Sequence, residues 1–423
     1  MSQPVITLYV FLAAYLLFVL LPARRAVVAV TAGVVLIFAG AISVRDALYS
    51  VNWNVMGIFV GMLVVADAFM ESRVPAYLAE IIVDRMKSTA WAILSICILS
   101  SFISAFVENV ATVLIVAPVA LSLARKLKIN PVKMMIAIAI SSNLQGTATL
   151  IGDPPSMLLG GFAKMNFADF FCYHGRPSIF FAVEIGAIAS FAVLYFIFMH
   201  LRKKAQLIPV ERVRSWVPTG LLVLLILMLA ASSFFDTGFS YLAGTICMLF
   251  GAISVAWKKF INRKPVLGAL KKLDWETTFF LAGVFILVGA VTLTGWIDKA
   301  ALFLSGIVGP NILLAYVLLI IMSVTLSAFI DNVPFLAAML PVAISMSAKL
   351  GIKPPLLLFG LLIGASLGGN ITPIGASANI VACGLLKKEG YEVRFGEFMK
   401  IGVPFTLAAV IAASIFVWFV WGG

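Results

Sequence analysis

The sequence is poor in charged residues, which occupy only 11% of its 423 positions, whereas hydrophobic residues occupy 63%. Soluble domains usually carry charge at about a quarter of their positions, so this composition excludes a soluble globular protein. Apolar stretches of 17 or more residues recur along the whole chain, close to the length that one helical crossing of a bilayer needs. The alternating segments of membrane β-barrels are missing. The chain is therefore predicted to be an all-α polytopic membrane protein.

Cysteine and histidine are also scarce, with four and two residues. The cysteines are isolated, so neither a disulfide framework nor a metal site is predicted. The chain lacks a GxxxxGKS/T motif and a catalytic constellation, so we expect no enzyme activity and no cofactor, and ATP could drive transport only through a separate ATPase subunit. The net charge of +12 is explained by membrane topology, and no nucleic acid partner is predicted.

Ten helical crossings are predicted from the apolar stretches. They cover residues 4–21, 26–43, 54–72, 134–162, 178–200, 217–234, 240–257, 276–293, 355–383 and 401–420. Two further apolar regions, 89–125 and 311–349, are interrupted by an acid followed by an asparagine. A carboxylate at the centre of a crossing costs about 2.5 to 3.5 kcal/mol, so both regions are predicted to be re-entrant hairpins with buried tips.

The basic residues predict the orientation. With two hairpins and ten crossings, 24 of the 30 Lys and Arg residues lie on one side, including Arg24-Arg25, Arg202-Lys203-Lys204 and Lys271-Lys272. The positive-inside rule assigns that side to the cytoplasm. Both termini are therefore predicted to be extracytoplasmic, in a bacterial inner membrane.

The chain contains an internal repeat. FVENVATVLIVAPVALSLARKLKINP, starting at Phe106, aligns without gaps with FIDNVPFLAAMLPVAISMSAKLGIKP, starting at Phe329, at an offset of 223 residues. Each half holds five crossings and one hairpin, and because five is odd the second half must enter the membrane upside down. Residues 1–205 and 206–423 are therefore predicted to be two inverted-topology repeats.

Crossings 134–162 and 355–383 are predicted to be broken helices. Their central strings, NLQGTATLIGDPPSMLLG from Asn143 and SLGGNITPIGASANIVACG from Ser366, carry glycine and proline where a continuous helix would run. Half-helix ends expose backbone dipoles near the bilayer midplane, where transporters bind solutes and ions. Both breaks and both hairpin tips are expected to surround one polar centre, in which no Lys or Arg is placed.

Three acids are predicted deep in the membrane, Glu108, Asp153 and Asp331, and we expect them to carry coupling protons because burial disfavours a charged carboxylate. Asp67 and Glu184 lie nearer span ends and are read as structural. The candidate solute- and ion-binding residues are Glu108, Asn109, Thr112, Asn143, Gly146, Thr147, Thr149, Gly152, Asp153, Asp331, Asn332, Gly369, Asn370, Thr372, Gly375, Ser377 and Asn379.

These motifs resemble the arsenite permease and P-protein branch of the ion transporter superfamily, relatives of the divalent anion:sodium symporters. GDPP and GASAN carry the likeness, which runs from about Trp53 to the end of the chain. The resemblance implies an elevator-type transporter with scaffold and transport domains, and a homodimer. The sodium-coupled relatives have Ser-Asn-Thr at both hairpin tips, whereas this chain has Glu108-Asn109-Val110 and Asp331-Asn332-Val333, which argues against their sodium sites.

The function predicted from these observations is proton-coupled efflux of arsenite and antimonite. Arsenite is uncharged at neutral pH, so hydroxyls and amides could bind it without a cationic residue. Two alternatives stay open at this point. One is a sodium-coupled symporter of dicarboxylates, tricarboxylates or other anions, and the other is a sodium/proton antiporter.

Overall fold

A computed structural model describes residues 2–202, 211–260, 268, 271 and 273–422. The predicted boundary between residues 205 and 206, and parts of two predicted basic clusters, Lys203-Lys204 and Lys272, lie outside the described residues. Within them the chain is almost entirely helical, with one two-stranded antiparallel pair, β1 (Cys172–Tyr173) and β2 (Arg176–Pro177). The prediction of an all-α membrane protein is confirmed.

The helices before residue 203 are α1 (Gln3–Leu20), η1 (Pro22–Arg24), α2 (Arg25–Phe38), α3 (Val44–Ser50), α4 (Trp53–Glu71), α5 (Val74–Arg85), α6 (Thr89–Ser104), α7 (Asn109–Leu127), α8 (Val132–Gly146), α9 (Pro154–Ala163), η2 (Ala168–Phe170) and α10 (Ile179–Phe198). The helices after residue 210 are α11 (Val217–Ser232), α12 (Leu242–Phe260), α14 (Trp275–Leu293), α15 (Trp296–Val308), α16 (Ile312–Ser327), α17 (Asn332–Lys349), α18 (Pro355–Gly368), η3 (Gly369–Ile371), α19 (Ser377–Lys388) and α20 (Phe395–Trp421).

Local sequence explains where several helices begin. Ser43, Asn52, Ser88 and Asn311 each precede a helix, and each side chain accepts a hydrogen bond from a backbone N–H in its first turn. Such caps satisfy N–H groups that have no partner inside the helix. Because the chain lies in lipid, unpaired backbone groups would be especially costly, so these polar residues fix the helix boundaries.

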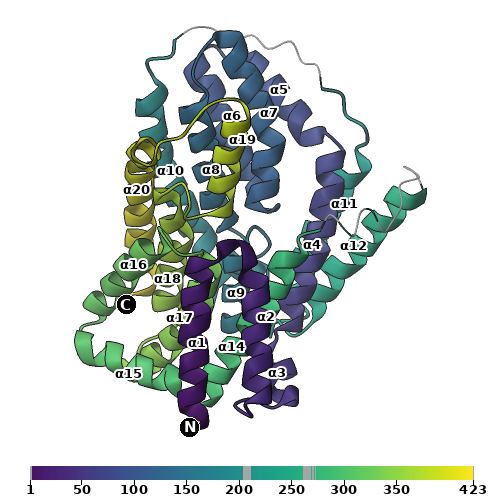
Figure 1. The fold of residues 1–423 in the computed structure, drawn as a ribbon. Helices are drawn as coiled ribbons and strands as arrows, with labels where there is room; N and C mark the ends of the chain where they lie inside the picture. Colours follow the sequence, from purple (N-terminus) through teal and green to yellow (C-terminus); the bar gives the residue numbers. More distant parts are fainter. Residues whose placement is uncertain (1, 203–210, 261–267, 269–270, 272, 423) are drawn as a thin grey trace.

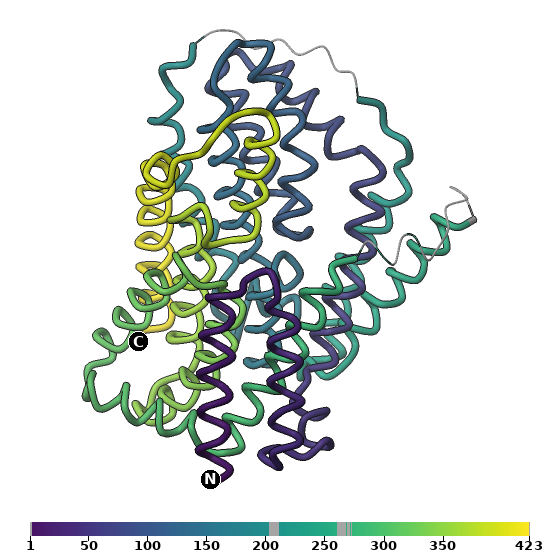
Figure 2. Tube along the Cα trace, in the orientation of Figure 1, coloured from purple at the N-terminus to yellow at the C-terminus, as the bar shows by residue number. Residues whose placement is uncertain are grey.

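The helices pack in pairs taken from distant parts of the chain. Helix α2 packs against α14, and α4 packs against α12; α10 packs against α20, α6 against α8 and α16 against α18. Figure 1 shows α4, α11 and α12 on one side of the molecule and α10, α16 and α20 on the other, with α1 and α2 in front. The tube in Figure 2 shows the N-terminus at the end of the molecule opposite the turn between α6 and α5.

Eight helices among the described residues are long and apolar enough to cross a membrane. They are α1, α4, α7, α10, α12, α14, α17 and α20. Six of them match predicted crossings, but α7 and α17 are arms of the predicted hairpins and pass the same length and composition test. The predicted crossings 134–162 and 355–383 are each divided into two shorter helices, which is why neither appears among the eight. The predicted crossings 26–43 and 217–234 are also missing from the eight, because α2 and α11 are shorter than 18 residues.

Candidate functional site

Both predicted hairpins and both predicted broken helices contain a non-helical segment. Residues 105–108 separate α6 from α7, and residues 328–331 separate α16 from α17. Residues 147–153 separate α8 from α9, whereas the break after α18 consists of η3 and residues 372–376. The Pro154-Pro155 pair begins α9 instead of lying inside the break, because proline is well suited to a first helical turn. Ser377 and Asn379 likewise lie inside α19.

Threonine hydroxyls connect each broken helix to the neighbouring hairpin tip. The Oγ1 of Thr149 donates to the carbonyl of Ala105, and the Oγ1 of Thr372 donates to the carbonyl of Ala328. Both carbonyls lie just beyond the end of a helix, where they have no partner of their own. The two hydroxyls were predicted to bind solute, but here they are occupied in holding the breaks together.

The tip asparagines are held in the same way. The Oγ of Ser104 donates to Asn109 Oδ1 at 2.6 Å, and Ser327 donates to Asn332 Oδ1. These two hydrogen bonds lie 223 residues apart in the sequence, the offset of the internal repeat. Ser104 and Ser327 were not among the predicted site residues, although each occurs five positions before a tip asparagine and could have been noticed through the repeat.

The glycines in the breaks permit close approach of backbone and side chains. A Cβ atom added to Gly146 would collide with the side chain of Asn109, and one added to Gly152 would collide with the carbonyl of Gly146. In the second break a Cβ on Gly375 would lie 2.6 Å from the carbonyl oxygen of Gly369. No side chain fits at these distances, so the repeated glycines are explained by packing of each break against its hairpin tip.

Three buried asparagines join the two broken helices directly. The Nδ2 of Asn143 on α8 donates to Asn370 Oδ1 at 2.8 Å and to Asn379 Oδ1 at 2.9 Å. The Nδ2 of Asn379 in turn donates to the carbonyls of Gly369 and Thr372, both at 3.0 Å. The breaks were expected to surround a polar centre whose amides bind a solute. In this structure those amides bind one another and the backbone of the second break instead.

The three predicted acids all cap helices. Glu108 caps α7, Asp153 caps α9 and Asp331 caps α17, each by accepting a hydrogen bond from a backbone N–H two or three residues later at 2.9 to 3.2 Å. A carboxylate at a helix N-terminus is stabilised by the backbone dipoles. The position of each acid immediately before a helix is therefore also explained by helix capping.

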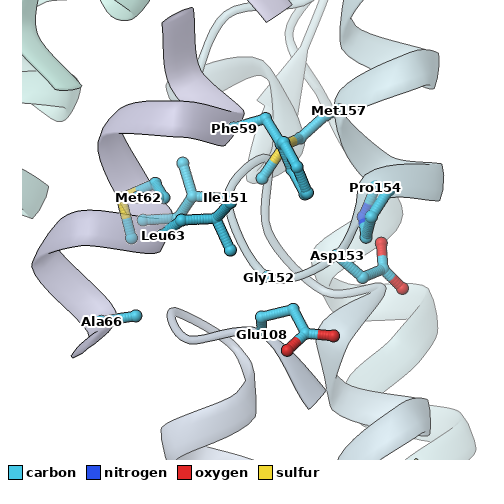
Figure 3. A pocket seen from close by; sticks show the side chains of 10 residues that line it. All are labelled: Phe59, Met62, Leu63, Ala66, Glu108, Ile151, Gly152, Asp153, Pro154 and Met157. Atoms are coloured by element: carbon cyan, nitrogen blue, oxygen red, sulfur yellow. The ribbon is translucent and has the colours of Figure 1, made fainter. Parts of the chain in front are cut away.

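Glu108 and Asp153 line one small pocket between α4 and the first break (Figure 3). Its volume is about 10 Å³, near the minimum that holds one water molecule. In Figure 3 both carboxylates lie at the lower end of the pocket, and apolar side chains from α4, the break and the start of α9 form the rest of its wall. The lining residues are Phe59, Met62, Leu63, Ala66, Glu108, Ile151, Gly152, Asp153, Pro154 and Met157. No Lys, Arg or His of the described chain belongs to this lining.

Asp331 at the second tip has a different environment. Its carboxylate forms an ion pair with Arg25, the first residue of α2, whose guanidinium also donates to Thr277 Oγ1 at 3.1 Å. The expectation that no Lys or Arg lies in the site is therefore wrong. Arg25 was assigned to a cytoplasmic loop, because its position beside Arg24 reads as a topology signal, and 306 residues separate it from its partner.

The remaining predicted polar residues are placed as follows. Thr112 is buried within α7, and its hydroxyl donates to the carbonyls of Val107 at 3.4 Å and Glu108 at 3.3 Å. Thr147 is buried in the first break, whereas Ser377 is exposed at the start of α19. The structure thus brings the predicted residues of the two breaks and tips together, but most of their polar atoms are engaged with one another.

Glu184 and Asp67 each bind another side chain of the protein. The carboxylate of Glu184 on α10 accepts a hydrogen bond from Gln145, which immediately precedes the break at Gly146. This pair lines a cleft of about 640 Å³ between α6 and α10, which is otherwise mostly apolar. Asp67 on α4 accepts from Lys258 on α12. The structural interpretation of Asp67 and Glu184 agrees with these contacts, although neither simply extends to a membrane surface.

The sequence matches the model of a known protein family. The citrate transporter family model matches residues 15–356 and 317–422. An uncharacterized transporter of Mycobacterium tuberculosis is 30% identical over 98% of both chains. The mouse P protein is 26% identical over 84% of this chain, and the match covers 52% of the P protein.

Two solved structures share the fold. The YdaH transporter of Alcanivorax borkumensis superposes with a TM-score of 0.60 over 88% of this chain and 87% of that one, at 16% identity. MtrF of Neisseria gonorrhoeae, described as illuminating a class of antimetabolite efflux pumps, superposes with a TM-score of 0.59 over 92% of this chain and 84% of that one, at 15% identity. At such identities the likeness concerns the fold alone.

Proposed function

The chain belongs to the citrate transporter family, and from this premise we propose that it is a proton-coupled secondary active transporter that exports arsenite and antimonite. The observation that carries the proposal is the pocket shared by Glu108 and Asp153, which is too small for a solute but large enough for about one water molecule. Two carboxylates in a largely apolar pocket repel each other when both are ionised. The pocket is therefore suited to hold a proton on either of its acids.

Electrostatics supports an uncharged solute. The breaks and tips carry three acids, Glu108, Asp153 and Asp331, whereas the cation found in contact with them is Arg25, which Asp331 already neutralises. A multiply charged anion would be repelled by this arrangement. A neutral trihydroxy acid needs only hydrogen-bonding partners, and the asparagine and threonine side chains of the breaks could supply them if movement of the tips releases them.

A carboxylate is the second candidate substrate. The family description favours it, and Arg25 provides a guanidinium at the second tip that could bind a carboxylate if Asp331 became protonated. A sodium-coupled anion symporter and a sodium/proton antiporter therefore remain as alternatives to be tested beside arsenite export.

The test uses everted membrane vesicles that contain the wild type, Glu108→Gln or Asp153→Asn. The wild type should accumulate arsenite in response to an imposed pH gradient without sodium, and each variant should lose at least tenfold of this accumulation because its pocket can no longer exchange a proton. Glu392→Gln, at an exposed position, is the matched control and should behave like the wild type. Accumulation of citrate, or uptake that requires sodium and ignores the pH gradient, would replace the proposal with the corresponding alternative.

We also propose that the two halves are inverted repeats that form an elevator-type scaffold and transport domain. The packing of α2 against α14 and of α4 against α12 supports this. By the internal repeat α2 is equivalent to α12 and α4 is equivalent to α14, so each packed pair joins non-equivalent helices of the two halves in the same way. The repeated contacts of Ser104 and Ser327 support it further. The hairpin tips would then open toward opposite sides of a bacterial inner membrane, with both termini outside.

Accessibility of single cysteines to an impermeant thiol reagent tests this arrangement. In a background without the four native cysteines, Ser2→Cys and Lys353→Cys should react from outside intact cells, and Lys128→Cys should react only after permeabilisation. Labelling of Lys128→Cys and Lys353→Cys from the same side would overturn the inverted arrangement. The homodimer and any ATPase subunit can be examined by the mass of the purified detergent-solubilised protein.

A further inference from the structure

Arg25 is anchored on one side by α14. Its guanidinium donates to Thr277 Oγ1 at 3.1 Å and lies 5.1 Å from the ring centre of Phe280, a cation–π distance. Asp274 caps α14 and accepts from Thr277 through both the backbone N–H, at 2.9 Å, and the hydroxyl, at 2.6 Å. Thr277 and Phe280 therefore hold Arg25 against α14 whatever its acidic partner.

On its other side Arg25 reaches across to the second hairpin tip. Asp331, which pairs with Arg25, caps the start of α17, and one turn further Pro334 accepts a 2.6 Å hydrogen bond from the hydroxyl of Tyr15 on α1. Two contacts thus tie the start of α17 to α1 and α2. Any movement of α17 relative to these helices must break both contacts.

Among the described residues, no equivalent cation contacts the first hairpin tip. Helix α12 is the second-half equivalent of α2. Helix α2 begins with the cationic residue Arg25, whereas α12 begins with the apolar residue Leu242. Glu108 makes no ion pair with Arg25, and Arg25 and Asp274 act on it only through longer-range electrostatics. One guanidinium therefore lies near the tip acids of both halves, and in the described chain it is in contact with one of them.

We infer that Arg25 is a shared counter-ion that exchanges Asp331 for Glu108 as the tips move. A guanidinium left without a partner in a low-dielectric environment is strongly disfavoured. Separation of α17 from α2 is therefore easiest when Asp331 takes up a proton and Glu108 gives one up, so that Arg25 always faces one ionised acid. Asp274 and Thr277 move with Arg25 and orient it. The exchange links the charge of the acids to the position of the tips, and in this form it rests on the proposed proton coupling.

The first part of the test compares charge variants in transport assays. Arg25→Gln and Asp331→Asn should each lower transport at least tenfold, and the reversed pair, Arg25→Asp with Asp331→Arg, should recover part of the loss because an ion pair forms again. Arg25→Lys, which keeps the charge, should be less impaired than Arg25→Gln. Arg24→Gln is the matched control, since Arg24 is the exposed neighbour of Arg25, and it should transport normally.

The second part measures proximity without any solute, so its result is independent of which substrate the protein carries. In a cysteine-free background that keeps Arg25, Glu108 and Asp331, the neighbouring pairs Arg24→Cys/Ile330→Cys and Arg24→Cys/Phe106→Cys are treated with a bifunctional thiol reagent of fixed length in membranes at several pH values. Both pairs should cross-link, and the ratio between them should change at least threefold with pH. Failure of the Arg24→Cys/Phe106→Cys pair to cross-link at every pH, or a ratio independent of pH, would overturn the exchange. Absence of arsenite transport by the wild type, with both pairs cross-linking as expected, would instead count against the proposed function.

Discussion

Lys258 on α12 donates to the carboxylate of Asp67 on α4, and its side chain is only 3% exposed. A second acid of α4, Glu71, lies 3.6 Å from the same ammonium group. The pair joins two helices whose backbones pack tightly, since a Cβ on Gly61 of α4 would collide with the backbone at Cys247 of α12. A buried ammonium is tolerated only because carboxylates compensate its charge.

Replacement of Lys258 by Met should destabilise the protein by about 2 to 4 kcal/mol, because Asp67 is left without its cationic partner in a poorly solvated position. The double variant Lys258→Met/Asp67→Asn should recover part of this loss. Thermal unfolding in detergent measures both, with the exposed Lys353→Met as control. Equal melting temperatures for the wild type and Lys258→Met would show that the ion pair does not hold α4 to α12.

Replacement of Gly146 by Ala should reduce transport at least tenfold with little loss of protein in the membrane. The new Cβ would displace the side chain of Asn109 and so disturb the 2.6 Å hydrogen bond from Ser104. Gly220→Ala on α11 is a matched control, because nothing lies within 4 Å of the position of its Cβ. Transport at the wild-type rate by Gly146→Ala would contradict the assigned role of the close contact.

Replacement of Asn143 by Ala should lower the free energy of unfolding by about 2 to 4 kcal/mol, because two buried amide oxygens lose their donor. Asn143→Asp should be at least as damaging, since a carboxylate oxygen would face the acceptors Asn370 and Asn379. For comparison, the exposed helix cap Asn311→Ala should cost about 1 kcal/mol. Unchanged stability of Asn143→Ala together with lost transport would indicate that Asn143 contacts solute instead.

The helix breaks could be predicted because their causes are local. Glycine and proline within an apolar stretch disfavour a continuous helix, and an acid followed by asparagine marks the start of a new one. Local sequence preferences also explain the errors at the edges of the breaks. Pro154 and Ser377 were read as parts of the breaks, although both occur at positions that favour a helix start.

The contents of the site could not be predicted to the same extent. The polar side chains of the breaks were all interpreted as ligands for a solute, yet Asn143 and Asn379 bind each other, and Thr149 and Thr372 bind carbonyls of the hairpin tips. A buried polar group needs a partner, and the sequence does not say whether that partner is a solute or the protein itself.

By itself the sequence determined that the chain is helical, lies in a membrane and contains an internal repeat, because composition, apolar run length and self-similarity need no knowledge of contacts. The tertiary structure alone decided that Arg25 meets Asp331 across 306 positions, while Glu108 lies in a pocket that no cation of the described chain lines. Which charges are paired depends on the packing of helices that are distant in sequence, and the strength of their interaction depends on how far that packing excludes water.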